Sequence, residues 1–189
     1  MQPQEKKRRY SFNEYEALEN EIGQRLIYYF GEVFAMAGTT KRHNKIVGNI
    51  AFALRELIQK KKCEVFTENV KLELITNEYY VYPDVLLTCH AEDIADDTKT
   101  LVKYPSLIAE VLSESTQNYD LQEKKTYYFK IPQLQYYLLV YPKTYKAELY
   151  ERKGNFWIFS FYEQAKDIIQ MPQINLTLSL ETIYQNIQL

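Results

Sequence analysis

The chain has 189 residues, a length that suits one domain with a substantial buried core. Charged residues make up 25% of it and hydrophobic residues 46%, which is an ordinary globular composition. With 23 basic against 25 acidic residues, the net charge of -2 excludes a general attraction to polyanions, so any nucleic-acid site must be a local patch.

The basic runs at residues 6–9 and 60–62 are explained most simply as a solvated tail and a helix end. Cys63 and Cys89 lie far apart and lack the paired spacing of zinc ligands. They predict neither a zinc site nor a disulfide framework, so a reducing cytoplasm is the expected location. No N-terminal apolar leader and no apolar run of ~20 residues is seen, and we expect a cytoplasmic protein without a membrane partner.

Residues 1–10 are polar and basic, and we expect them to form a loose arm. Residues 11–14 are Ser-Phe-Asn-Glu, a capping box in which the serine caps a helix and the glutamate reaches back to it. This helix should continue to Gly23. Aromatic and β-branched residues dominate residues 26–36, which predicts a β-hairpin with Gly31 in its turn.

Residues 38–40, Gly-Thr-Thr, precede apolar residues at helical spacing, which predicts a long amphipathic helix to about Lys60. Two strands are expected next, at residues 64–75 and 79–89, separated by a short turn. Residues 91–103 are polar and acidic, which is typical of a surface loop or a short helix.

Residues 107–112 form a nearly continuous apolar run, as expected of a central strand buried on both faces. A helix is expected at residues 116–131, ended by Pro132. The rest of the chain predicts three strands, a short strand and a closing helix, at residues 135–141, 147–152, 156–161, 176–178 and 180–187. Together these elements predict one mixed α/β (α+β) domain over residues 11–189, with a central sheet flanked by helices.

Two carboxylates fall where strands are expected. Asp84 follows Pro83, and because proline is disfavoured in central strands, a bulge or strand end there would turn Asp84 toward a cleft. Glu110 lies in the buried run at 107–112, where a carboxylate is costly unless it is paired or metal-bound. An ordinary turn and a strand end reaching solvent are the alternatives, but together the two residues favour a shared site for a hard divalent cation.

Three polar residues of the expected helix follow at intervals of four: Asp120, Lys124 and Tyr128. This spacing places them on one face, from which Lys124 could point inward. An ordinary Asp–Lys helix pair, worth about 0.2–0.5 kcal/mol, explains the spacing equally well. A lysine beside a metal and its bound water suits the cleavage of phosphodiester bonds.

His43 and Glu32 are weaker candidates. His43 lies at the start of the second helix, whose positive end should favour the neutral imidazole, and a satisfied, half-buried histidine is the simpler explanation. Glu32 follows the Gly31 turn and could supply a third carboxylate, although an ordinary surface glutamate fits as well. His90 is the only other histidine, so a multi-histidine metal site is not expected.

Several segments, in their order and spacing, resemble the Uma family of restriction-endonuclease-like proteins, a branch of the PD-(D/E)XK nuclease superfamily. They are GEVFAMAG at 31–38, RHN at 42–44, YPDV at 82–85, EVLS at 110–113, ST at 115–116, the positions Asp120, Lys124 and Tyr128, and LTLSL at 176–180. The resemblance covers nearly the whole chain, from about Tyr10. It implies a restriction-endonuclease-like fold, with a central mixed β-sheet flanked by α-helices and an N-terminal helix and hairpin.

The resemblance also implies that Asp84 and Glu110 are metal ligands. Nucleases with this carboxylate pattern usually carry a lysine where Leu112 stands. In this family the lysine has moved to the following helix, which is where Lys124 lies, and Leu112 is then expected in the core.

The sequence therefore favours a DNA endonuclease that depends on Mg²⁺, for which Mn²⁺ should substitute. Asp84, Glu110 and the backbone carbonyl of Val111 would hold the ion, and Lys124 would orient or deprotonate the attacking water. Supporting roles would fall to Asp120 and Tyr128, which hold Lys124, and to Glu32 and His43.

Two positions depart from the family pattern, because Ile27 and Asn69 stand where acidic residues are usual. With the near-neutral charge, they keep open a catalytically weak or inactive module that retains the fold and binds nucleic acid or another partner. A metal-dependent hydrolase of a different phosphodiester is a third hypothesis. Cutting both strands of DNA is simplest with two sites, which favours a homodimer.

Overall fold

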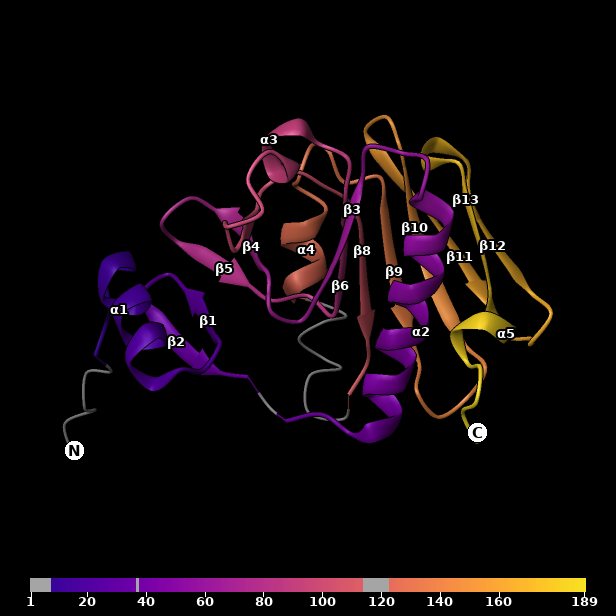
Figure 1. The fold of residues 1–189 in the computed structure, drawn as a ribbon, viewed down its shortest axis with the longest axis horizontal. Coiled ribbons are helices and arrows are strands. Elements are labelled where there is room, and N and C mark those ends of the chain that lie inside the picture. Colours follow the sequence, from indigo (N-terminus) through magenta and orange to yellow (C-terminus); the bar gives the residue numbers. More distant parts are fainter. Residues whose placement is uncertain (1–7, 37, 114–122) are drawn as a thin grey trace, which may run out of the picture.

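The computed structural model describes residues 8–36, 38–113 and 123–189, which form two principal sheets and a separate hairpin (Figure 1). The larger sheet has six strands, in the spatial order β11 (Phe156–Tyr162), β10 (Ala147–Lys153), β9 (Tyr136–Val140), β8 (Pro105–Val111), β6 (Val85–Thr88) and β3 (Glu64–Thr67). The smaller sheet has five, in the order β2 (Glu32–Ala35), β1 (Leu26–Tyr29), β5 (Tyr79–Val81), β4 (Lys71–Ile75) and β7 (Leu101–Val102). The hairpin pairs β12 (Ile168–Met171) with β13 (Leu176–Ser179).

The larger sheet is covered on both faces. The α-helices of the described residues are α1 (Phe12–Ile22), α2 (Lys41–Ile58), α3 (Ala91–Ile94), α4 (Lys125–Tyr128) and α5 (Leu180–Ile183), and a 3-10 helix, η2, covers Pro172–Ile174. One core cluster joins a face of the sheet to α2, α5 and the hairpin, and a second joins the other face to the smaller sheet and the α4 region. This arrangement explains why β8 and β9 are apolar at nearly every position. Within the described ranges, no helix is both long and apolar enough to cross a membrane.

Local signals at the N-terminus are confirmed. The Ser11 hydroxyl accepts a hydrogen bond from the Glu14 N–H, and the Glu14 carboxylate accepts one from the Ser11 N–H at 2.7 Å, so the capping box is present. Gly23 ends the helix in a left-handed conformation, with φ 63°. Phe30 and Gly31, with φ of 45° and 86°, form the turn between β1 and β2.

The two strands expected at residues 64–75 and 79–89 each bend and pass from one sheet to the other. The first divides into β3 and β4 around residues 68–70, and the second into β5 and β6 around residues 82–84. Pro83 lies in the second bend, so the strand break expected there is present. Because β3 pairs with β6 and β4 pairs with β5, the two bends lie opposite each other where the sheets meet.

A buried ionic cluster ties α1 to the second bend. The Glu19 carboxylate lies 2.9 Å from the Lys71 ammonium and accepts hydrogen bonds at 2.8 Å from the Tyr82 hydroxyl and the Leu26 N–H. Buried charges are tolerated when they are paired and hydrogen-bonded in this way. Because the partners come from different elements, the cluster fixes the chain immediately before Pro83.

Other elements differ from the sequence predictions. The closing helix expected at residues 180–187 is the short α5, and the strand β12 was not expected. Of the helix expected at residues 116–131, residues 114–122 lie outside the described ranges, and the α-helical part of the remainder is α4. A short helix, α3, is present within residues 91–103, as one of the two alternatives predicted, but the strand β7 near the end of this range was not expected.

Cys63 and Cys89 form a disulfide, so the expectation that they give no disulfide framework is wrong. They are 26 residues apart in the sequence. The pairing of Glu64 with Thr88 between β3 and β6 brings the two cysteines opposite each other, just beyond the ends of these strands. The spacing of the two cysteines in the sequence does not reveal this strand register. The cysteines no longer support a reducing compartment, and the cytoplasmic location stays a prediction.

Replacing both cysteines by serine should lower the free energy of unfolding by about 3 kcal/mol, because the bond closes a long loop in the unfolded chain. Urea unfolding of the Cys63→Ser/Cys89→Ser protein and of the parent, each with and without reductant, measures this. Reductant should reproduce the loss in the parent and leave the double variant unchanged. Equal stability of all four samples would show that the bond contributes nothing.

Candidate functional site

Asp84 lies in the bend between β5 and β6, directly after Pro83. Its Oδ2 accepts a hydrogen bond from the Val111 N–H at 2.7 Å and lies 3.2 Å from Nε2 of His43. Its own N–H donates to Oε2 of Glu110 at 3.3 Å. Asp84 therefore lies between a histidine on one side and a second carboxylate on the other.

His43 is buried in the first turn of α2, which Thr40 caps by accepting a hydrogen bond from the His43 N–H. Burial lowers the pKa of His43, but the hydrogen bond to Asp84 and the charge of that carboxylate outweigh it, and the pKa is raised overall. The helix end was expected to lower this pKa, but the full charge of Asp84 at 3.2 Å acts in the opposite direction and is the stronger influence. Nδ1 of His43 is buried and has no hydrogen-bond partner within the described part of the chain.

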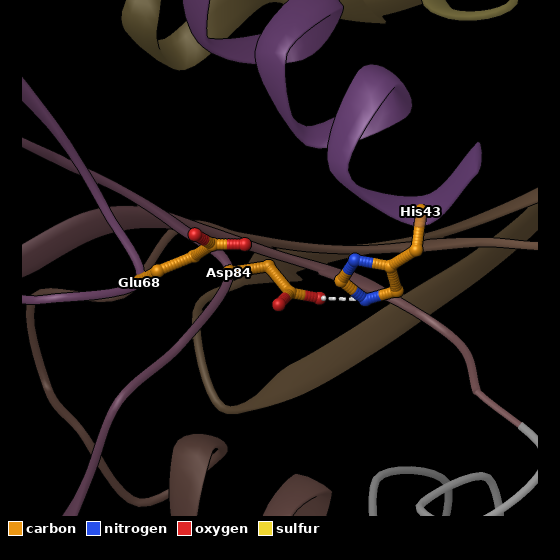
Figure 2. Close-up of side chains that lie close together, drawn as sticks. All are labelled: His43, Glu68 and Asp84. Carbon is orange, nitrogen blue, oxygen red and sulfur yellow. Dashed lines mark ion pairs between the residues drawn. The ribbon is translucent and has the colours of Figure 1, made fainter. Parts of the chain in front are cut away.

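Glu68 is a third member of this group and was not among the site residues predicted from the sequence. One ligand atom from each of His43, Glu68 and Asp84 lies within 4.8 Å of the others. Figure 2 shows the three side chains approaching one another, from α2 and from the two bends. We call these residues the acidic triad.

The backbone of Glu68 adopts a left-handed conformation with φ 44°, which is uncommon for a residue with a side chain and costs about 1–3 kcal/mol. The Asn69 N–H bonds to the Thr67 carbonyl across this tight turn. Because Thr67 pairs with Val85, the position opposite Asp84 is Glu68. If the two predicted strands are paired as a hairpin, the break before Asp84 implies a matching break at Glu68. Glu68 could therefore have been identified from the sequence in this way.

Glu110, Lys124 and Tyr128 form a second, buried cluster. Nζ of Lys124 lies 3.1 Å from Oε1 of Glu110, and the Tyr128 hydroxyl donates to the same oxygen at 2.7 Å. Burial and the charge of Glu110 raise the pKa of Tyr128 well above its usual value, so its hydroxyl stays protonated and donates. The spacing of four residues thus brings Lys124 and Tyr128 to one carboxylate.

Both groups line a single cleft of about 760 Å³. His43, Glu68, Asp84, Glu110 and Lys124 all contribute to its wall. The cleft lies where the bends between β3 and β4 and between β5 and β6 meet the start of α2 and the end of β8. A substrate group that enters it would meet carboxylates, an imidazole and an ammonium together.

The other sequence candidates are placed differently. Leu112 is buried in the core, as expected. Ile27 and Asn69 line the cleft, so both departures from the family pattern lie at the site. Glu32 belongs to β2 and is not among the lining residues of the described chain. Asp120 lies outside the described residues.

The acidic triad fits a divalent cation. Carboxylate oxygens suit Mg²⁺ and Mn²⁺, and imidazole is a ligand for several transition metals. The buried Nδ1 of His43, which has no described partner, supports this fit. Glu110 is outside the metal-ligand group found among the described residues, since its oxygens face Lys124, Tyr128 and the Asp84 N–H. Metal binding by Glu110 stays a prediction.

The chain is similar to known proteins over most of its length. The model of the Uma2 family, described as "Putative restriction endonuclease", matches residues 12–182. Two uncharacterized proteins of Synechocystis sp. are similar. One, sll1609, is 33% identical over 142 residues, which is 75% of this chain and 80% of the relative. The other, slr1290, is 30% identical over 161 residues, which is 85% of this chain and 83% of the relative.

A solved structure has the same fold. The crystal structure of "a putative nuclease belonging to DUF820" from Anabaena variabilis aligns with a TM-score of 0.74 at 14% identity. The alignment covers 92% of this chain and 97% of that one. The mixed α/β, restriction-endonuclease-like fold expected from the sequence is therefore confirmed.

Proposed function

The chain belongs to the Uma2 family, and on this premise we propose that it is a divalent-metal-dependent endonuclease that hydrolyses phosphodiester bonds in DNA. The observation that carries the proposal is the position of Asp84. This one residue contacts both His43 of the acidic triad and Glu110 of the lysine-bearing cluster, in the same cleft. Metal ligands and a proton-transferring group are then adjacent, as phosphodiester hydrolysis requires.

We assign the metal ligands to Asp84, Glu110 and the backbone carbonyl of Val111, with His43 and Glu68 supplying further donors beside Asp84. When bound, Mg²⁺ or Mn²⁺ would polarise the scissile phosphate and lower the pKa of a coordinated water. The Val111 N–H hydrogen bond holds the Asp84 carboxylate in one orientation, which limits the reorganisation needed for binding.

Lys124 is the proposed proton-transferring group. Its ammonium is buried beside Glu110 and lines the cleft, from which it would orient the attacking water or stabilise the charge that develops on the phosphate. Tyr128 positions Lys124 through the oxygen of Glu110 that both contact. Supporting roles for Asp120 and Glu32 remain part of the proposal.

Glu68 can compensate for one of the two departures from the family pattern, which are at Ile27 and Asn69. Asn69 lacks the usual carboxylate, but Glu68, one residue earlier, presents one to the same cleft. The loss at Asn69 is therefore offset by a neighbour, which supports an intact site. Ile27 has no such neighbour in the wall of the described cleft.

The purified protein should nick or linearise plasmid DNA with Mg²⁺ or Mn²⁺ and leave it intact with EDTA, because the carboxylates at the cleft need a cation to accept a phosphate. Gel electrophoresis of supercoiled plasmid after incubation measures this. A panel of duplex DNA, single strands, RNA and small phosphodiesters, run with the same metals, tests whether DNA is the preferred substrate. No cleavage of any substrate would contradict the proposal.

A non-catalytic module that binds nucleic acid or a partner is the second candidate, because Ile27 and Asn69 leave the cleft with fewer acids than the family pattern. Calorimetry separates the two candidates. DNA binding without any Mg²⁺ or Mn²⁺ binding would favour the module.

We also propose a basic arm at residues 1–10, a single domain at residues 11–189, a homodimer that cuts both strands and a location in the cytoplasm.

A further inference from the structure

A second cleft, of about 740 Å³, adjoins the cleft that holds the acidic triad. The two share part of their walls, namely Gly38, Thr39, His43 and Ser113. His43 thus faces Asp84 in one cleft and forms the edge of the other. A polymer chain that leaves the first cleft can continue into the second.

The two clefts differ in charge, because the first is lined by three carboxylates beside Arg25 and Lys124, and the second by cations. The second cleft is lined by Lys41, Arg42 and Lys143, and no carboxylate is found among its described lining residues. A smaller hollow beyond it, of about 470 Å³, is lined by Lys41 and Arg42 again and by Lys45. In a chain with a net charge of -2, this is the local basic patch that a polyanion site requires.

The fold brings these cations together from distant parts of the chain. Lys41, Arg42 and Lys45 project outward from the first turns of α2, and His43 from the same turn is buried. Lys143 follows β9, which runs parallel to β8 and ends beside it. Because parallel strands end at the same edge of a sheet, the residue after β9 reaches the helix start.

The three cations on α2 are exposed, and the described residues offer no ion-pair partner to any of them. Exposed lysine and arginine side chains attract phosphate groups, whereas the carboxylates of the first cleft repel them unless a cation intervenes. The same side chains distributed over an acidic surface would not have this effect. The basic cleft therefore complements the carboxylate cleft along one path.

We propose that the second cleft binds the phosphates of the DNA strand next to the scissile one, through Lys41, Arg42 and Lys143. The inference rests on the proposed function, since it takes the substrate to be DNA. These residues position the strand and do not take part in the reaction. Their contacts depend on the charge of the phosphates and do not distinguish one base sequence from another.

The test uses a Lys41→Gln/Arg42→Gln/Lys143→Gln protein and a fluorescein-labelled duplex of about 30 base pairs in EDTA, where no cleavage interferes. Anisotropy titrations over a range of salt concentrations give the slope of log Kobs against log[salt]. Each lost phosphate contact should make the slope less negative by about 0.9, so the triple variant should lose about 2 to 3 units of slope. A Lys41→Gln/Arg42→Gln protein, which leaves Lys143 intact, should lose about 2.

The matched control is Lys60→Gln/Lys62→Gln/Lys166→Gln, which removes the same number of exposed cations, two of them just beyond the C-terminal end of α2. It should keep the slope of the parent. An equal loss of slope in this control, or a parental slope in both cleft variants, would overturn the inference, and so would a parent that binds no DNA. A parent that binds through the cleft but never cleaves would leave the inference standing and remove the nuclease proposal.

Discussion

An Asp84→Asn protein should fail to bind Mn²⁺ in the cleft and should cleave DNA about a thousandfold more slowly than the parent. The amide has nearly the shape of the carboxylate but no charge to hold a cation. A catalytic metal contributes several kcal/mol, and a loss of about 4 kcal/mol corresponds to three factors of ten in rate. Calorimetry with Mn²⁺ and single-turnover cleavage of a labelled duplex measure the two effects.

The same variant has a readout that does not depend on activity. Asp84 raises the pKa of His43, so its replacement should move that pKa downward, which NMR titration of the imidazole can follow. Asp97→Asn is the matched control, since it removes one carboxylate from an exposed position outside the cleft. Parental Mn²⁺ binding and cleavage in the Asp84→Asn protein would show that the site assignment is wrong.

Much of the local structure was predictable from the sequence. Ser11 and Glu14 contact each other within one turn, and the chain reversal at Gly31 needs only a tight turn with positive φ. The apolar character of β8 follows from burial on both faces, which leaves the same pattern wherever it occurs. Features of this kind depend on residues that are close together in the chain, so they can be predicted from one sequence.

Features that depend on the pairing of distant segments were missed. A break was predicted at Pro83 in the second strand, but none was predicted in residues 64–75, which carry no proline or glycine. Their passage between two sheets is decided by which strands they pair with. Glu68 and the disulfide were missed for this reason, since each becomes visible only when β3 is aligned with β6.

The direction in which the pKa of His43 shifts was also decided by tertiary structure. The helix start predicted a neutral imidazole from local electrostatics alone. Asp84, 41 positions later in the numbering of the chain, then supplies the larger effect at 3.2 Å. Asp84 itself was identified because Pro83 marks the break that turns it into the cleft. The local signal therefore located Asp84, but it did not show that Asp84 contacts His43.

Lys124 offers the second large effect, and its burial makes the choice of substitution important. Removing the ammonium would leave Glu110 buried beside Tyr128 without a cation, and breaking such a pair costs about 3–5 kcal/mol of stability. A Lys124→Met protein that loses activity could then simply be unfolded. Arginine keeps the positive charge next to Glu110, and because the guanidinium stays protonated it does not exchange a proton near neutral pH.

A Lys124→Arg protein should therefore fold and bind Mn²⁺ like the parent but cleave DNA at least a hundredfold more slowly, as expected when a proton-transferring group is lost. Urea unfolding, calorimetry and single-turnover cleavage at several pH values measure the three properties. Tyr128→Phe is the companion variant, because it removes one hydrogen bond to the same Glu110 oxygen and leaves Lys124 in place. It should slow cleavage far less. Parental cleavage by the arginine variant at every pH would limit Lys124 to an electrostatic role, since a fixed charge at this position would then be sufficient for the reaction.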